Sequence, residues 1–233
     1  MTRLRLALLN SAEGDEGIIA TNRNFRRELD ADLTEFVVSR GQLPPDFDFD
    51  GIVVTGSAAS AYWDEEWIHE TCEWVRKAHE KGIPILGVCF GHQLLAAALG
   101  GTVEDMGGFE IGYRDVEHSD SPLFEGIDEQ FTVFTTHGDA VTELPEDADL
   151  IAENEYGIHG FQVGHAFGVQ FHPEYDVPTA TRVTQNKEFL GEERINAVLS
   201  GITDENYAAA CESKQLFQNF TDYVREVRVD APA

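Results

Sequence analysis

The chain has 233 residues, and its 42% hydrophobic content is enough to bury one sizeable core. Its 43 acidic residues outnumber the 16 basic ones and give a net charge of −27, which argues against nucleic-acid binding because that function needs a basic face. No apolar run is long enough to cross a membrane and no signal-peptide cleavage site follows the first apolar residues, so we expect a cytoplasmic protein with no membrane partner.

Strands and helices alternate through the first part of the chain. Short apolar runs predict strands at residues 4–9, 52–55 and 83–88, and apolar side chains recur at helical spacing over residues 25–37 and 67–78. A third helix is expected directly after the last of these strands. This alternation predicts an α/β fold, with a doubly wound, mostly parallel sheet and helices on both faces. In such folds the functional residues lie at the carboxyl ends of the strands.

The second part of the chain combines shorter strands with two C-terminal helices. The helices are predicted over residues 179–190 and 207–227, the second with an apolar face. We expect both to pack on the same domain, so that residues 1–233 form a single domain with 176–233 as a helical extension. A dimerisation or partner-docking surface is the alternative, and the oligomeric state is left open. The short strands are expected at residues 102–103, 111–116, 131–134, 150–151, 160–163 and 167–171.

A nucleophile is indicated where the strand at 83–88 meets the third helix. The sequence there is Gly-x-Cys-x-Gly, from Gly87 to Gly91, with Cys89 at its centre. A strand that turns sharply into a helix in this way presents the central side chain at the top of the sheet. The helix also points its positive end at the sulfur, which favours the reactive thiolate. A buried structural cysteine beside a tight turn is the alternative.

A partner for this cysteine follows the strand at residues 167–171. His172 and Glu174 are two positions apart, so their side chains project to the same side of an extended chain, and Pro173 between them favours that conformation. A cysteine nucleophile needs a histidine to take and return its proton, and the histidine needs an acceptor that fixes its tautomer. The sequence therefore predicts that Cys89, His172 and Glu174 meet at one edge of the sheet.

The remaining histidines are weaker candidates for chemistry. His92 follows the nucleophile at a spacing that aims it away from the sulfur, so we expect a solvated or capping residue. A zinc site built from His159, His165 and His172 would match no common ligand spacing, and no Cys-x-x-Cys pair occurs. We therefore expect no metal site.

Composition also carries information about the environment. The acidic residues are spread along the whole chain and only four of the basic residues are lysine, as in proteins of salt-accumulating halophiles. At about 1 M salt the Debye length falls to roughly 3 Å, which screens such self-repulsion. An acidic surface adapted to a partner is the competing interpretation. Three cysteines without a pattern suit a reducing compartment, and Cys72 and Cys211 are expected to be small core residues.

The two motifs around Cys89 and His172 resemble the signature of the class I glutamine amidotransferases, whose triad is Cys, His and Glu. Residues 53–57 are similar to the strand and loop that supply an oxyanion-hole amide in that family. Residues 135–141, with His-Gly-Asp at their centre, resemble a segment of its guanylate-synthetase branch. Segments 56–62 and 108–112 are similar to those of stand-alone, single-domain members. The resemblance covers the chain from Leu4 to Glu174.

The resemblance implies a flavodoxin-like amidotransferase architecture, and it implies roles for particular residues. It assigns catalysis to the triad, the oxyanion hole to the backbone amides of Gly56 and Phe90, and substrate binding to Gln93, Gly138 and Asp139. No cofactor is implied.

The implied reaction is hydrolysis of the γ-amide of glutamine through a γ-glutamyl thioester on Cys89, with ammonia released for a separate synthetase. The chain contains no Gly-x-x-x-x-Gly-Lys-Ser/Thr phosphate loop, so any nucleotide chemistry must come from that partner. A free-standing γ-glutamyl peptide hydrolase or transferase is the alternative. A noncatalytic sensor is the third hypothesis, and the intact triad argues against it.

Overall fold

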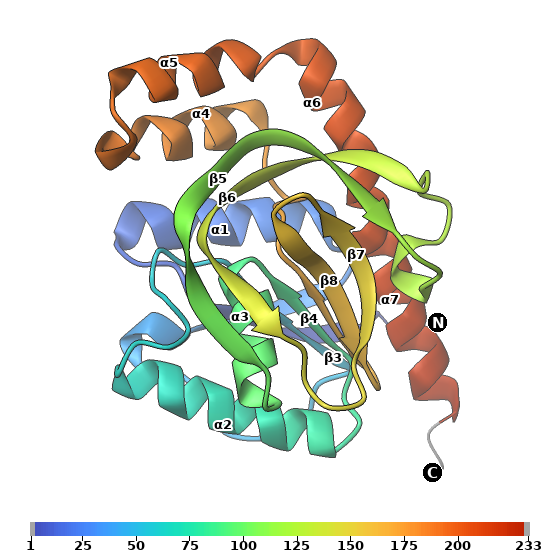
Figure 1. The fold of residues 1–233 in the computed structure, drawn as a ribbon. Coiled ribbons are helices and arrows are strands. Elements are labelled where there is room, and N and C mark those ends of the chain that lie inside the picture. The colour runs from blue at the N-terminus through green and yellow to red at the C-terminus, as the bar shows by residue number, and fades with distance from the viewer. Residues whose placement is uncertain (1–2, 231–233) are drawn as a thin grey trace.

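The computed structural model describes residues 3–230, and within them nine strands form one mixed sheet in the order β2-β1-β3-β4-β9-β8-β7-β5-β6 (Figure 1). Helices cover both faces of its parallel half. The α/β class predicted from the sequence is therefore confirmed. The strands are β1 (Arg5–Asn10), β2 (Asp32–Val37), β3 (Gly51–Val54), β4 (Ile85–Val88), β5 (Thr102–His118), β6 (Gln130–Glu143), β7 (Asp149–Asn154), β8 (Gly157–Val163) and β9 (Ala166–Val169).

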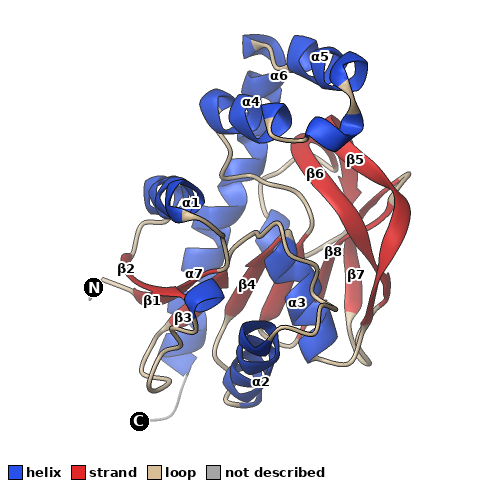
Figure 2. Ribbon diagram, turned by 90° about the vertical axis from the view of Figure 1, so that its left-hand side faces the viewer, coloured by secondary structure: helices blue, strands red, loops and turns tan. Residues whose placement is uncertain are grey.

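The parallel half of the sheet comprises β2, β1, β3, β4 and β9. Strands β3, β4 and β9 are buried along their whole length, because layers cover both of their faces. One core cluster joins this half to α1 (Asp15–Glu28) and α7 (Gln215–Asp230), and the other joins it to α2 (Glu66–Glu80) and α3 (Phe90–Ala98). Figure 2 shows the two helical layers on opposite sides of these strands.

The other half of the sheet is antiparallel, so the expectation of a mostly parallel sheet holds only for the first half. Strands β8, β7, β5 and β6 each pair in antiparallel fashion with their neighbours. Only two residues separate β7 from β8 and two separate β8 from β9, whereas a parallel pair needs a long crossover. The two short strands expected at 102–103 and 111–116 are parts of β5, whose register shifts between Asp105 and Glu110.

The predicted helix over residues 25–37 is wrong in its position. Helix α1 lies earlier, at Asp15–Glu28, and Leu29 already has an extended backbone. Residues 32–37 form strand β2, which pairs in parallel with β1 from Arg5↔Asp32 to Asn10↔Val37. The apolar residues after Leu29 fit a helical period by coincidence, and hydrogen bonding to the edge of the sheet overrides that pattern.

Residues 177–230 contain four α-helices, α4 (Val177–Gln185), α5 (Glu192–Gly201), α6 (Asp204–Ala210) and α7. The single helix expected over 207–227 is divided by a 3₁₀ turn at Cys211–Lys214, and α5 was not predicted. Leu216, Phe217, Phe220 and Val224 of α7 are buried in the core, whereas Cys72 and Cys211 are half-buried.

The single-domain organisation stays a prediction. None of the described helices has the length and apolar content that a membrane crossing needs.

Candidate active site

Cys89 lies at the sharp turn between β4 and α3, in a backbone conformation that L-residues rarely adopt. Its φ is 54° and its ψ is −106°, and such a strained residue costs on the order of 1–3 kcal/mol. A Cβ atom on Gly87 would overlap the carbonyl of Gly91, and one on Gly91 would overlap the carbonyl of Val54. The two glycines are therefore required sterically. The Cys89 N–H donates to the Val169 carbonyl at 2.8 Å, which holds the turn in place.

His172 and Glu174 follow β9 and lie beside this turn, as the sequence predicts. The Nδ1 atom of His172 lies 2.8 Å from Oε1 of Glu174, and both side chains are buried. The backbone N–H of His172 donates to the Phe134 carbonyl at 2.9 Å. The ring of Tyr175 stacks on the imidazole with centroids 4.1 Å apart. Backbone, carboxylate and ring contacts together fix the orientation of the imidazole.

Electrostatics favour a protonated His172. Burial lowers the pKa of this imidazole, but the negative charges of Cys89 and Glu174 outweigh burial and raise the pKa to about 10. The histidine therefore holds its proton through neutral pH, next to the sulfur. An imidazolium beside a sulfur at a helix N-terminus is the arrangement that activates a cysteine nucleophile.

The backbone at Gly56 completes this side of the site. A Cβ atom on Gly56 would lie 3.0 Å from Cε1 of His172 and 3.6 Å from Cβ of Cys89, so the loop after β3 lies directly against both residues. Phe90 is the first residue of α3. Both positions are next to the sulfur-bearing residue, and their assignment to an oxyanion hole stays a prediction.

Two of the three predicted substrate-binding residues, Gln93 and Asp139, are in contact with each other. The side-chain Nε2 of Gln93 donates to the Asp139 carbonyl and to Oε1 of Gln170, both at 3.0 Å. The Asp139 carboxylate accepts a hydrogen bond from the Tyr62 hydroxyl at 2.9 Å. Gly138 lies between His137 and Asp139 on β6. The substrate-binding role of these residues stays a prediction.

A cavity of about 300 Å³ opens beside the triad. Its lining includes His172, Glu174, Gly56 and Thr136 together with residues of helices α1 and α4 and of the neighbouring loops. Gln93, Gly138 and Asp139 are not among its lining residues. This space therefore lies on the histidine side of the site.

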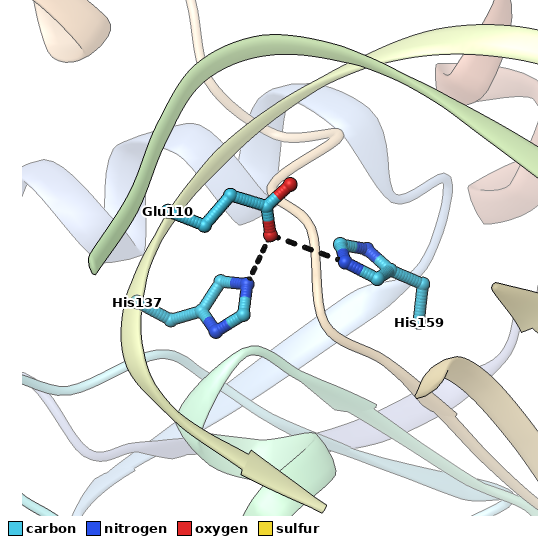
Figure 3. A group of neighbouring side chains, drawn as sticks. All are labelled: Glu110, His137 and His159. Atoms are coloured by element: carbon cyan, nitrogen blue, oxygen red, sulfur yellow. Dashed lines mark hydrogen bonds and ion pairs between the residues drawn. The ribbon is translucent and has the colours of Figure 1, made fainter. Parts of the chain in front are cut away.

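A second buried cluster, which the sequence did not predict as a group, lies behind β6 (Figure 3). Strand pairing sets Glu110 of β5 opposite His137 of β6, and their Oε2 and Nε2 atoms are 2.5 Å apart. Nε2 of His159 approaches the same oxygen at 3.1 Å, and Asn154 donates to Oε1 at 2.9 Å. Glu110 is fully buried. Burial raises the pKa of its carboxyl group, but hydrogen bonds from the two histidines outweigh burial and lower that pKa to about 2.

The ligand atoms of Glu110, His137 and His159 lie within 4.8 Å of one another, close enough to be tested for a metal site. The 2.5 Å contact is a hydrogen-bond distance, whereas zinc bonds of about 2.0–2.1 Å hold tetrahedral ligand atoms about 3.3 Å apart. The Arg114 guanidinium is also 3.9 Å from Glu110, where it would repel a metal cation. We therefore interpret the group as a hydrogen-bonded cluster.

This cluster is linked to the His-Gly-Asp segment through His137. Its Nδ1 lies 2.8 Å from the Asp139 carbonyl, and since a carbonyl can only accept, this nitrogen carries a proton. The three histidines of the zinc set considered from the sequence lie apart. His172 pairs with Glu174, His159 approaches Glu110, and Nδ1 of His165 lies 2.6 Å from the Tyr223 hydroxyl.

The expectation of a solvated or capping His92 is wrong. The side chain is fully buried in α3, against the ring of Phe161 at 5.1 Å between centroids. Helix α3 is enclosed between the sheet and α2, so nearly all of its residues are buried whichever way they point. Burial lowers the pKa of His92 to about 3, which keeps the imidazole neutral.

Known proteins resemble this chain in sequence. The chain is 34% identical to γ-glutamyl peptidase 5 of Arabidopsis thaliana over 153 residues, which are 60% of this chain and 61% of that protein. It is 33% identical to the glutamine-hydrolysing GMP synthase of Thermomicrobium roseum over 188 residues, 69% of this chain and 35% of that protein. The chain thus spans less than two thirds of each relative.

Solved structures match over nearly the full length. A glutamine amidotransferase from Thermotoga maritima superposes with a TM-score of 0.78 at 26% identity, covering 97% of this chain and all of that one. A glutamine amidotransferase from Methylobacillus flagellatus shares the fold with a TM-score of 0.73 at 20% identity, covering 95% of each chain. The family model for class I glutamine amidotransferases matches residues 25–190, and the chain belongs to this family.

Proposed function

We propose that this protein hydrolyses the γ-amide of glutamine through a γ-glutamyl thioester on Cys89 and releases ammonia for a separate synthetase. The observation that carries the proposal is the strained Cys89, with φ of 54°, next to the buried His172 and Glu174 pair. A residue held in a rare backbone conformation at a strand-to-helix turn is typical of nucleophiles. The membership of the family supports the same chemistry.

The proposed reaction has two steps. The Cys89 sulfur attacks the γ-carbonyl, and His172 donates its proton to the nitrogen as the carbon–nitrogen bond breaks. His172 then takes a proton from water, which attacks the thioester and releases glutamate. Glu174 keeps the imidazole oriented through its 2.8 Å contact with Nδ1. In this scheme the same histidine acts first as an acid and then as a base.

The negative oxygen of the tetrahedral intermediate needs donors that are already in place. We propose the backbone amides of Gly56 and Phe90, each typically worth about 3 kcal/mol of barrier. Gln93, Gly138 and Asp139 would bind the α-amino and α-carboxylate groups of the substrate. The contact between the Gln93 side chain and the Asp139 carbonyl supports a common role for these residues.

The two candidate functions differ in what happens to the nitrogen that is released from the substrate. GMP synthase relatives support an ammonia donor that works with a synthetase of that kind, because the chain corresponds to 35% of the Thermomicrobium roseum protein. The γ-glutamyl peptidase relatives support a free-standing γ-glutamyl peptide hydrolase or transferase. The cavity beside His172 favours this second candidate, since it offers room beyond the scissile nitrogen. The buried triad disfavours a noncatalytic sensor.

We propose that the protein works in the cytoplasm of a salt-accumulating cell. The net charge of −27 would cause self-repulsion in dilute buffer, and molar salt screens it. Cys89 must also remain a free thiol, which a reducing compartment ensures.

The test is glutamate release in about 2 M KCl, where surface repulsion is screened. Two substrates, glutamine and a γ-glutamyl dipeptide, are each assayed with the parent protein and with Cys89→Ala. We expect turnover by the parent and none by the variant. Equal activity of the two proteins on every substrate would refute the assignment of the nucleophile. Strong turnover of dipeptide with little of glutamine would reject the ammonia-donor function.

A further inference from the structure

The cavity beside the triad has a wall that comes from the C-terminal extension. The cavity is lined by His172 and Gly56, and by Gly17, Thr21 and Asn24 of α1. Further lining residues belong to α4 and the turn that follows it, namely Thr179, Arg182, Val183, Asn186 and Lys187. The same space is therefore lined by His172 and by residues of two helices.

Two cations line this space in a strongly acidic protein. Arg182 and Lys187 are both half-buried, and neither forms an ion pair with a carboxylate of residues 3–230. By contrast, Arg27 on the neighbouring α1 contacts both Glu28 and Asp176. Lys187 is one of four lysines in a chain with a net charge of −27. Cations without local partners at such a place are suited to an anion from solution.

The surroundings of Lys187 hold its ammonium near the site. Nζ lies 5.1 Å from the centroid of the Phe109 ring, and burial lowers the pKa of Lys187 while the charge of Cys89 opposes that effect. Two carboxylates, Glu13 and Glu174, also line the cavity. Glu174 is bound to His172, and Glu13 belongs to the loop after β1. The side of the cavity that carries Arg182 and Lys187 is therefore positively charged, and the Glu174 carboxylate is already paired with His172.

Proton transfer from His172 connects this cavity with the leaving group of the proposed reaction. His172 gives its proton to the scissile nitrogen, so whatever that nitrogen carries lies next to His172 and extends into the space that His172 lines. The nitrogen of glutamine carries only hydrogen atoms and would leave the space between the helices unused. A substituted nitrogen would fill it.

We infer that this cavity binds an amine leaving group that carries a carboxylate, as is released when a γ-glutamyl amino acid or peptide is cleaved. The inference rests on the proposed thioester chemistry at Cys89 and develops the second candidate function, the γ-glutamyl peptide hydrolase or transferase. The sulfur–carbon bond forms, the carbon–nitrogen bond breaks, and the His172 proton goes to the departing amine. The carboxylate of that amine is held by Arg182 and Lys187, with Asn186 beside them. Water then hydrolyses the thioester.

The experiment compares γ-glutamyl-glycine with γ-glutamyl-glycinamide, which differs by the absence of the carboxylate charge. Glutamate release is measured at one fixed KCl concentration for the parent, Arg182→Gln, Lys187→Gln and the double variant. Lys187→Arg keeps the charge. Lys77→Gln is the matched control, because Lys77 lies on α2 in an exposed ion pair with Glu73.

We expect the parent to prefer the free carboxylate by about tenfold or more in kcat/KM, the value of one charge-assisted contact. The preference should fall toward unity in Arg182→Gln and Lys187→Gln, mainly through KM, and persist in Lys187→Arg and Lys77→Gln. Equal rates on the two substrates in the parent, or a preference that survives in the double variant, would overturn the assignment of the cavity alone. If no γ-glutamyl compound, glutamine included, releases glutamate, the proposed function fails as well.

Discussion

Replacing Glu110 by Gln probes the buried cluster behind β6 without changing the volume of the side chain. The carboxylate lies 2.5 Å from Nε2 of His137 and 3.1 Å from Nε2 of His159, and it accepts from Asn154 at 2.9 Å. Glutamine can keep the contact with Asn154 through its oxygen. It cannot supply the negative charge that both histidines face.

The size of the effect follows from the pKa of Glu110. The hydrogen bonds in the folded state lower this pKa from 4.5 to about 2, although burial opposes them. Each unit corresponds to 1.36 kcal/mol, so the ionised carboxylate contributes about 3 kcal/mol at neutral pH. Because the folded pKa is depressed, this contribution is present above the unfolded pKa and is lost as the pH falls toward 2. More than half of it is lost by about pH 3.

The assay is urea unfolding in molar KCl at several pH values between 3 and 7. We expect Glu110→Gln to lower the free energy of unfolding by about 3 kcal/mol at pH 7 and by progressively less below about pH 5. Glu104→Gln is the control, since Glu104 is an exposed residue of the same strand and should change little. A difference below about 0.5 kcal/mol at pH 7, or one that does not shrink on acidification, would refute this account of the cluster.

Four further outcomes concern the triad, the turn that carries Cys89, and the charged surface. Glu174→Gln should lower the pKa of His172 from about 10 toward its ordinary value, because it removes one of two negative charges; an NMR titration of the imidazole measures this, and an unchanged midpoint would contradict it. The sign also predicts that the stability contributed by the His172 proton is complete below pH 6.5 and is lost as the pH rises through about 10. Gly91→Ala should destabilise the fold by more than about 3 kcal/mol, since its Cβ would overlap the Val54 carbonyl, and near-parental urea unfolding would refute the steric argument. Dialysis from molar KCl into dilute buffer should unfold the protein, given its charge of −27, and a circular dichroism spectrum that stays native would count against the halophilic interpretation.

The sequence predicted the triad because its signals are local. Cys89 lies in a glycine frame that a tight turn requires, and His172 and Glu174 are separated by a single proline. Each motif follows an apolar strand, and neighbouring parallel strands end at the same edge of a sheet. The pairing of β4 with β9 brings the two motifs together. No distant contact had to be known for this prediction.

The predictions for other elements were wrong because residues far away in the sequence decide their structure. Residues 32–37 carry a pattern that fits a helix, yet hydrogen bonds to β1 make them a strand. His92 was expected to be solvated, but the sheet and α2 enclose the whole of α3. In each case tertiary packing overrides the local signal.

The sequence by itself predicted that Cys89, His172 and Glu174 meet at strand ends, and it predicted the α/β class, because short spacings and apolar periodicity encode both. Only the tertiary structure brought Glu110 beside His137 and His159, since the register of β5 on β6 and the position of β8 decide that contact. It alone also set Arg182 and Lys187 of the C-terminal extension around the space next to His172. These groups come from segments far apart in the chain, and their meeting depends on packing that no local pattern records.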